Sequence, residues 1–135
     1  MERSLFIIKP DAAKRNLIGR ILSYMEAAEL TVIGLRMVFM TPEIAAGFYK
    51  VHEGKAFYDS LVEYMSSGRS VVVVLEGEDA INRIRKICGA TDPSKADEGT
   101  IRAAFGISIT MNSVHASDSP ESADQEVPFF FPDLG

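Results

Sequence analysis

Five consecutive apolar residues, Val71 to Leu75, constrain the fold of this chain more than any other stretch. Four of them are valines, and β-branched side chains favour extended strands over helices. Successive side chains of a strand point to opposite faces of its sheet, so an unbroken apolar run needs cover on both faces. We therefore expect these residues to form the most central strand of a sheet.

Three more strands follow from shorter patterns. Residues 4–9 form a compact apolar run that ends at Pro10, where a backbone donor is lost. Residues 107–111 alternate apolar and polar side chains, which predicts a strand that ends shortly before His115. Residues 31–40 also have a period of two, and this alternation places five side chains on one face: Thr31, Ile33, Leu35, Met37 and Phe39.

Helices are expected between and after these strands. Apolar residues recur at helical spacing in residues 17–28, 57–65 and 81–88. The carboxylates of residues 76–79 suit the positive end of a helix, so we expect the third of these helices to start there. Thr41-Pro42 and Ser119-Pro120 each place a capping hydroxyl ahead of a proline, which is typical of a helix start. We expect the last helix to end near residue 125, with residues 128–135 as a tail.

Residues 89–105 form a long stretch of glycine, proline, aspartate and threonine with few large apolar side chains. An irregular loop of this length inside a compact domain is usually functional or part of an interface. We expect one domain over residues 1–135, which is long enough to bury a core. Pattern alone leaves both a parallel doubly wound sheet and an antiparallel sheet with segregated helices open.

The charge balance limits the classes of ligand. A net charge of −5 and a pI near 5.0 argue against non-specific binding to nucleic acid. A polyphosphate ligand would require cations gathered at one place. The single cysteine excludes an internal disulfide, and no apolar run approaches membrane-spanning length. With no signal sequence at its start, the chain is expected in the cytoplasm, without a membrane partner.

Glycine-rich phosphate loops are missing from the sequence. Neither G-x-x-x-x-G-K-[ST] nor G-x-G-x-x-G occurs, and Gly54-Lys55 is followed by an alanine. The protein-kinase sequences H-R-D and D-F-G are missing as well. A conventional phosphate-loop NTPase and a protein kinase are therefore excluded.

One of the two histidines stands in a cluster of polar side chains. His115 follows Asn112 and precedes Ser117, Asp118 and Ser119. An exposed imidazole with hydroxyl and carboxylate neighbours can shuttle a proton, bind a metal or act as a nucleophile. Taken alone, the same stretch also fits a capping turn in which the histidine has no chemical role.

Several motifs in a fixed order decide between these interpretations. They are Ile7-Ile8-Lys9-Pro10-Asp11, Gly89-Ala90-Thr91-Asp92-Pro93, Gly99-Thr100-Ile101-Arg102, Asn112-x-x-His115-x-Ser117-Asp118-Ser119 and Phe129-Phe130-Phe131-Pro132. Over nearly the whole chain, this order resembles the nucleoside diphosphate kinases. The resemblance implies the α+β class: a ferredoxin-like α/β sandwich whose four-stranded antiparallel sheet is flanked by helices.

The resemblance also implies an activity and partners. In that family a histidine, here His115, attacks the γ-phosphoryl group of a nucleoside triphosphate. The phosphohistidine then passes the group to a different nucleoside diphosphate, so the kinetics are ping-pong. Mg²⁺ is the expected cofactor, base specificity is expected to be broad, and the chain is expected to form a homo-oligomer, either a tetramer or a hexamer.

Phosphate contacts are implied for dispersed polar side chains. Lys9, Arg85, Thr91 and Arg102 would hold the phosphates, and Tyr49 would lie beside the catalytic ring. Arginine suits bidentate phosphate oxygens, and lysine acts as a point charge. Each of these residues also has an ordinary interpretation, as a solvated charge or, for the tyrosine, as core packing.

The remaining implied contacts surround the nucleoside and the histidine. Asn112 and Lys9 would bind ribose hydroxyls, and Phe57 with Ile109 would sandwich the base. Asp118 would reach the nucleotide-borne Mg²⁺ through water. Two further residues would orient the histidine region, Ser117 and Glu126. The ordinary alternatives are core packing for Phe57 and a solvated helix end for Glu126.

The sequence departs from the family pattern at three positions, and none of these departures removes a catalytic group. Ala116 replaces the usual glycine after the histidine, Leu75 replaces a frequent tryptophan, and alanine replaces an aspartate before Phe105. Two rival functions keep parts of the same pattern. One is a catalytically silent binding module, and the other is a histidine-dependent phosphohydrolase that loses its phosphoryl group to water.

Overall fold

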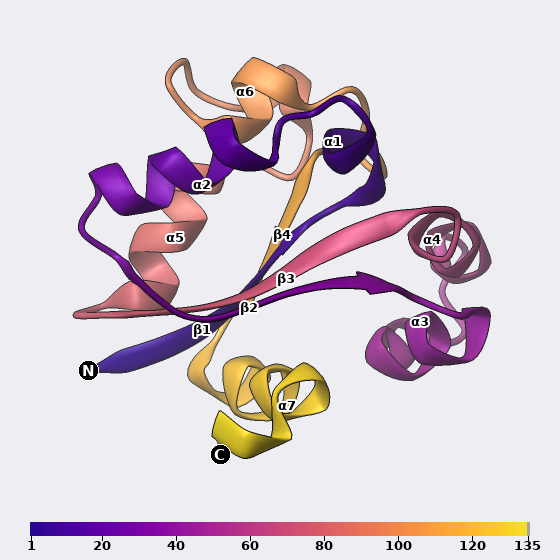
Figure 1. Ribbon diagram of the computed structural model, residues 1–135. Helices are drawn as coiled ribbons and strands as arrows, with labels where there is room; N and C mark the ends of the chain where they lie inside the picture. The colour runs from indigo at the N-terminus through magenta and orange to yellow at the C-terminus, as the bar shows by residue number, and fades with distance from the viewer. Residues whose placement is uncertain (135) are drawn as a thin grey trace.

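A four-stranded antiparallel sheet forms the centre of the molecule (Figure 1). The computed structural model describes residues 1–134, and Gly135, the last residue of the expected tail, lies outside them. The sheet has the strand order β2-β3-β1-β4. Its strands are β1 (Glu2–Ile8), β2 (Thr31–Phe39), β3 (Arg69–Gly77) and β4 (Val114–Ala116).

The apolar run of residues 71–75 lies in β3, as predicted. This strand pairs with β1 on one side and with β2 on the other, antiparallel in both cases. Side chains from Val71 to Leu75 are at most 4% exposed. The central position follows from the sequence, because β-branched side chains on both faces are stable only where both faces are covered.

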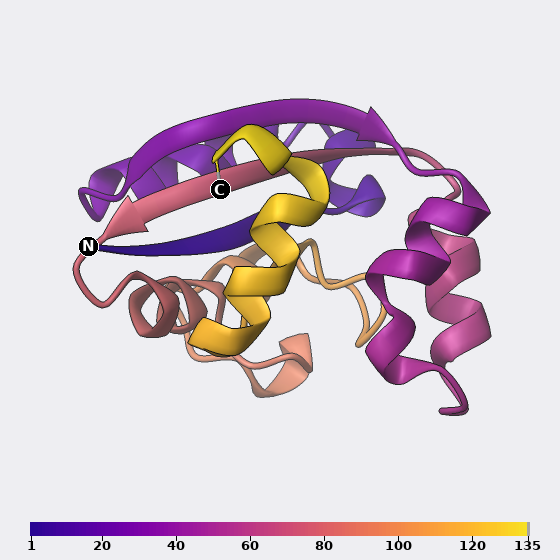
Figure 2. The ribbon, with the colours of Figure 1, turned by 90° about the horizontal axis from the view of Figure 1, so that it is seen from below.

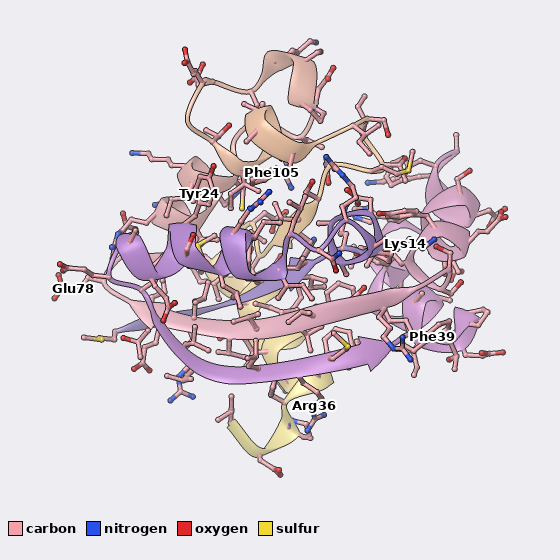
Figure 3. All side chains as sticks on the ribbon, turned by 45° about the horizontal axis from the view of Figure 1, so that its top comes forward. Lys14, Tyr24, Arg36, Phe39, Glu78 and Phe105 are labelled. Atoms are coloured by element: carbon pink, nitrogen blue, oxygen red, sulfur yellow. The ribbon has the colours of Figure 1, made fainter. Side chains whose placement is uncertain are left out.

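Two core clusters cover the two faces of the sheet. The first lies under α1 (Pro10–Lys14), α2 (Ile18–Ala27), α5 (Ala80–Cys88) and α6 (Ile101–Phe105), and includes Phe6, Ile8, Val73 and Leu75 from the strands. Figure 3 shows Tyr24 of α2 near Phe105 of α6, and their ring centroids are 6.2 Å apart. These contacts hold the segment after residue 89 against the rest of the fold.

The opposite face packs against α3 (Pro42–Phe48), α4 (Tyr58–Met65) and α7 (Pro120–Phe130). Figure 2 shows α7 crossing the sheet, with α3 and α4 side by side beyond one end. Short 3₁₀ segments at Lys50–His52, Pro93–Lys95 and Pro132–Leu134 complete the chain. The alternate residues of β1 and β3 face this side: Leu5, Ile7, Val72 and Val74.

The predicted helix starts are capped as expected. The hydroxyl of Thr41 accepts a hydrogen bond from the backbone N–H of Ile44 at 3.1 Å, and Ser119 does the same for Ser122. Each satisfies a donor that the first turn of a helix leaves without a partner. One start was placed too early: β3 continues to Gly77, and α5 begins at Ala80 rather than at the preceding carboxylates.

The prediction that five alternate side chains of β2 share one face is wrong. Val32 pairs with Leu75 and Gly34 pairs with Val74, so a bulge at Ile33 inserts one extra residue. A one-residue shift turns every following side chain to the other face. Leu35, Met37 and Phe39 therefore leave the side of Ile33, and each is more than half exposed.

The side chain of Arg36 lies on the opposite face of β2. Figure 3 shows it reaching toward α7, and its guanidinium donates to the carbonyl of Phe130 at 3.0 Å. The guanidinium also lies 5.3 Å from the centre of the Phe131 ring. This contact fixes the end of α7 to the edge strand.

The strand predicted at residues 107–111 does not form. The segment folds back on itself, with the N–H of Ile107 donating to the carbonyl of Met111 at 2.8 Å. Ile107 and Ile109 are 57% and 61% exposed, so the alternation of apolar and polar residues in this segment does not mark the buried face of a sheet. The strand is instead β4, which contains His115 in its middle and pairs with β1.

Two further boundaries differ from the prediction. Pro10 does not only end β1 but also begins the short helix α1. The last helix continues past Pro128 to Phe130, and Phe130 and Phe131 are buried against the sheet. Burial of these aromatic rings offsets the backbone hydrogen bond that proline removes, so residues 128–134 are no loose tail.

Gly89 tests the packing between α5 and the loop that follows. It has φ +87° and ψ −176°, and an added Cβ would lie 2.5 Å from the hydroxyl of Thr100. We expect Gly89→Ala to lower the free energy of unfolding by ~1–2 kcal/mol for the backbone and by ~1–3 kcal/mol for the clash. Chemical denaturation measures the change.

Gly99→Ala is the matched control. Gly99 also has a positive φ, +91°, but an added Cβ there meets nothing within 4 Å. This variant should lose only the backbone contribution. Equal losses in the two proteins would show that the contact with Thr100 adjusts without cost.

Candidate active site

A cavity of about 650 Å³ opens beside β4. Its walls come from the end of β1, the α3–α4 connection, α5, the loop after α5, α6 and β4. Most of the predicted site residues line it: Lys9, Tyr49, Phe57, Arg85, Thr91, Arg102, Ile109, Asn112, His115 and Asp118. The other two, Ser117 and Glu126, lie behind His115.

His115 is held from behind by a carboxylate. Its Nε2 lies 2.9 Å from Oε1 of Glu126, and the same oxygen accepts from the hydroxyl of Ser117 at 3.0 Å. A neutral imidazole that donates from Nε2 keeps a lone pair on Nδ1. The carboxylate of α7 therefore selects the tautomer in which Nδ1 is the nucleophilic nitrogen.

Aromatic rings restrict the orientation of the imidazole. The Phe48 ring is 5.5 Å from the His115 ring at an interplanar angle of 76°, and the Tyr49 ring is 6.1 Å away at 89°. Among the described residues, the Tyr49 hydroxyl is buried with no hydrogen-bond partner. Burial and the nearby Glu126 raise the pKa of Tyr49, so it stays a neutral donor.

Lys9 is a buried cation in the cavity wall. It is 7% exposed, and its Nζ donates to Oδ1 of Asn112 at 2.9 Å and to the carbonyl of Thr110 at 3.4 Å. Burial, and then the charge of Arg102, lower the pKa of Lys9 to about 8, against an opposing effect of Asp11. An anion in the cavity would relieve this unfavourable charge.

Arg102 is fixed by the backbone of two other elements. Its Nη1 donates to the carbonyl of Gly89 and its Nη2 to that of Val114, each at 2.8 Å. Its Nε is buried with no partner among residues 1–134. Burial lowers the pKa of Arg102, but a guanidinium stays charged at neutral pH.

Asn112 connects Lys9 to the loop after α5. Its Oδ1 accepts from Lys9, while its Nδ2 donates to the carbonyl of Thr91 at 2.9 Å. The amide is 2% exposed, so both of its hydrogen bonds form away from bulk water. The result is a pre-arranged row of polar groups along one wall of the cavity.

The mouth of the cavity is apolar. Phe57 and Ile109 are 48% and 61% exposed, although both are large apolar residues. Exposed apolar groups at a cavity mouth commonly mark a ligand contact. Lys55 lies over the Phe57 ring, with its Nζ 5.9 Å from the ring centre.

Sequence reasoning missed two side chains of this site. His52, to which it gave no role, lines the cavity, with its ring 6.3 Å from Tyr49 and 5.2 Å from Phe57. Phe48 contacts the His115 ring directly. The three-residue spacing of Tyr49 and His52 could have revealed the first, because residues one turn apart are neighbours.

Asp118 is the one carboxylate among the described residues that line the cavity. It lines the cavity, and a hydrogen bond from Ser122 at 2.6 Å lowers its pKa, so it is ionised at neutral pH. No three His, Cys, Asp or Glu side chains within residues 1–134 converge as a metal cage. One carboxylate fits Mg²⁺ that arrives bound to phosphates, because Mg²⁺ sites commonly combine few carboxylates with substrate oxygens.

Ala116 does not distort the backbone after the histidine. It lies in β4 opposite Phe6, and it is not among the described residues with positive φ. Leu75 is fully buried in β3, where it fills part of the first core cluster. Both departures from the family pattern are therefore accommodated by ordinary packing.

No helix in residues 1–134 is both long enough and apolar enough to span a membrane. The fold and the cavity define a ferredoxin-like α+β protein with a histidine in the wall of a cavity that is also lined by cations. Comparison with known proteins narrows this class. The family model described as nucleoside diphosphate kinase matches residues 2–134. The chain belongs to the nucleoside diphosphate kinase family.

Individual relatives match this chain over nearly their whole lengths. A nucleoside diphosphate kinase of Hydrogenovibrio crunogenus is 53% identical over 134 residues, which cover 99% of this chain and 95% of that protein. One from Brucella melitensis is 52% identical over 131 residues, or 97% and 94% of the two chains. The crystal structure of the Aquifex aeolicus nucleoside diphosphate kinase superposes with a TM-score of 0.96 at 47% identity, covering 98% and 96%. The predicted ferredoxin-like fold is confirmed.

The pKa of Lys9 predicts how stability varies with pH. In the folded state it lies at about 8, below the ordinary value of 10.5. Between these values the unfolded chain binds more protons, so the free energy of unfolding should rise as the pH increases. We expect Lys9→Met to remove this rise, as measured by denaturation at a series of pH values.

Lys14→Met is the control, because Lys14 is exposed. This variant should keep the wild-type slope of stability against pH. If Lys9→Met also keeps the wild-type slope, the lysine is charged at no cost in the folded protein and the assignment is wrong.

Proposed function

We propose that the chain is an active nucleoside diphosphate kinase that works through a phosphohistidine at His115. The observation that carries the proposal is the contact between its Nε2 and Glu126, which leaves Nδ1 as the nucleophile of a cavity lined by cations. Membership of the family supports the reaction, a transfer from a nucleoside triphosphate to a nucleoside diphosphate.

In the first step, the Nδ1 lone pair of His115 attacks the γ-phosphorus of the donor. An N–P bond forms, and the bond between that phosphorus and the bridging oxygen breaks, so the electron pair leaves with the nucleoside diphosphate. The ring becomes positively charged, and the Glu126 carboxylate at Nε2 stabilises it. In the second step, an oxygen of another diphosphate attacks the phosphorus and the imidazole is restored.

The cations would neutralise the transferring group. Lys9, Arg85 and Arg102 would contact phosphate oxygens, with a further hydrogen bond from Thr91. Phosphoryl transfer depends mainly on positioning and on stabilising charge, which a rigid cationic wall supplies. The Tyr49 hydroxyl, which has no partner among residues 1–134, would donate near the histidine.

Mg²⁺ would enter with the nucleotide, and it would neutralise phosphate charge while Asp118 holds it through water. The nucleoside would lie toward the mouth of the cavity. Lys9 and Asn112 would bind ribose hydroxyls, while Phe57 and Ile109 would enclose the base. Neither of these apolar side chains can read the edge of a base, which supports broad specificity.

We also propose that the chain assembles into a homo-oligomer. Three large apolar side chains, Leu35, Met37 and Phe39, are exposed on β2, which lies at one edge of the sheet. An exposed apolar edge strand favours association with another chain. Tetramer and hexamer are the two alternatives, and the mass of the assembly in solution distinguishes them. One domain over residues 1–135 and a cytoplasmic location stay predictions.

The central prediction concerns the covalent intermediate. Incubation with γ-labelled ATP and no acceptor should give an acid-labile, base-stable phosphoprotein that a nucleoside diphosphate discharges. His115→Ala should take up no label while still binding nucleotide, because it removes the nucleophile and none of the cations. His52→Ala is the control with the other histidine removed, and it should still become labelled because it retains His115.

Two outcomes would favour the rival functions. Rapid loss of the label to water without an acceptor would indicate a phosphohydrolase. Nucleotide binding without labelling of the wild-type chain would indicate a catalytically silent binding module.

Base specificity gives a second prediction. Stacking contributes ~1–3 kcal/mol per base and tolerates every base. Phe57→Ala should therefore raise KM by similar factors for adenine, guanine, cytosine, uracil and thymine diphosphates, with a smaller effect on kcat. Steady-state kinetics with one phosphate donor measures this. A wild-type preference above ~10³-fold for one base would contradict broad specificity, since such discrimination requires unpaired polar groups.

A further inference from the structure

A buried carboxylate outside the cavity connects three segments of the site. Asp11, in the first turn of α1, is 7% exposed. It accepts hydrogen bonds from the hydroxyl of Tyr64 and, at 3.3 Å, from the hydroxyl of Ser113. Its own N–H donates to the Tyr64 oxygen at 2.8 Å. The start of α1, the helix α4 and the segment before β4 therefore meet at this one side chain.

Ser113 has an unusual backbone conformation. Its φ is +77°, and the residue is fully buried. Non-glycine residues in this region are held there by their surroundings, and they cluster at functional sites. Two contacts hold Ser113: the hydroxyl bond to Asp11, and its carbonyl, which accepts from the Lys9 N–H at 2.8 Å.

The turn at Ser113 determines where the preceding side chain points. Asn112 is joined by its amide to Lys9 Nζ and to the carbonyl of Thr91. A backbone with ordinary φ at Ser113 would direct the chain away from this position. Through this turn, the hydrogen bond between Asp11 and Ser113 helps to position the Lys9–Asn112 pair.

Asp11 also contributes a negative charge that acts on Lys9. The groups that act on the Lys9 ammonium are Arg102 from α6, Cys88 from α5 and Asp11 from α1. Arg102 opposes the positive charge on Lys9, and Asp11 favours it. Within residues 1–134 Asp11 makes no ion pair shorter than 4 Å, so its charge acts on Lys9 without a direct ion pair.

We propose that Asp11 is a positioning residue of the nucleotide site: it fixes the Ser113 turn, and thereby the Lys9–Asn112 pair, and it balances the charge of Lys9. This inference rests on the proposed function, because the pair affects catalysis only if it holds a nucleotide. Asp11 lies behind the cavity wall and touches no substrate.

The first test is Asp11→Asn, which keeps the shape and removes the charge. Binding of a nucleoside diphosphate, measured by calorimetry across pH, should weaken in the wild type as Lys9 loses its proton above about pH 8. In Asp11→Asn the midpoint of this loss should move to lower pH, because a favourable charge is gone. A purely structural role would not move the midpoint.

Asp59→Asn is the matched control. Asp59 also lies in the first turn of a helix, α4, but it is exposed. Its removal changes the net charge by the same amount and should leave the midpoint in place. An identical midpoint in Asp11→Asn and Asp59→Asn would overturn the electrostatic part of the proposal.

Ser113 tests the positioning part, even if Asp11→Asn does not fold. Ser113→Ala loses the bond to Asp11 but keeps the unfavourable φ, whereas Ser113→Gly loses the bond and adopts a positive φ freely. We expect kcat/KM of Ser113→Ala to fall by ~10- to 100-fold, as small misplacements of site groups do. The kcat/KM of Ser113→Gly should stay within ~3-fold of wild type, because glycine adopts a positive φ without a hydrogen bond to hold it there.

Equal kcat/KM in wild type and Ser113→Ala would overturn the positioning role. Failure of the proposed function gives a different result: the wild-type chain would take up no phosphoryl group, while the calorimetric midpoints of wild type and Asp11→Asn would still report on Asp11. The two failures are therefore distinguishable.

Discussion

Cover on both faces of β3 is the condition on which the rest of the structure depends. Its side chains alternate between two core clusters, so both clusters depend on this one strand. One cluster brings α5 and α6, with Arg85 and Arg102, to the sheet, and the other brings α3 and α7, with Tyr49 and Glu126. The cavity forms where these two layers meet beside β4. The cations Arg85 and Arg102 and the carboxylate of Glu126 that contacts His115 thus come from opposite faces of a single sheet.

Although the protein is acidic overall, its cavity is lined by positively charged side chains. Lys9 and Arg102 are both largely buried, and burial lowers the pKa of each. The fold holds these charges at a cost that an anionic ligand would remove. Positive charge is therefore already gathered in the unliganded site, which is what a reaction governed by charge and positioning would require.

The sequence predicted the parts of the fold that depend on local chemistry. Val71 to Leu75 formed the central strand, and Thr41 and Ser119 capped their helices. The bulge at Ile33 could not be predicted, because an inserted residue leaves the apolar pattern unchanged and alters only its pairing. Residues 107–111 showed the alternation of a strand, but they fold on themselves and stay exposed.

Site residues were predicted by motif rather than by spacing. The structure places Lys9, Arg102 and His115 around one cavity, although they are far apart in the chain. The bond between Glu126 and His115 depends on how α7 docks, so Glu126 was named only through the family resemblance. Helix α7 itself was predicted too short, because Pro128 is tolerated only where Phe130 and Phe131 are buried.

The position of Glu126 has a consequence for synthesis of the protein. Helix α7 follows all four strands in the chain, and it packs against β1, the first of them. While the ribosome is still making this helix, all four strands precede it in the chain, but the imidazole has no carboxylate behind it. The nascent chain would thus gain the carboxylate that orients its histidine last, after all four strands have been made.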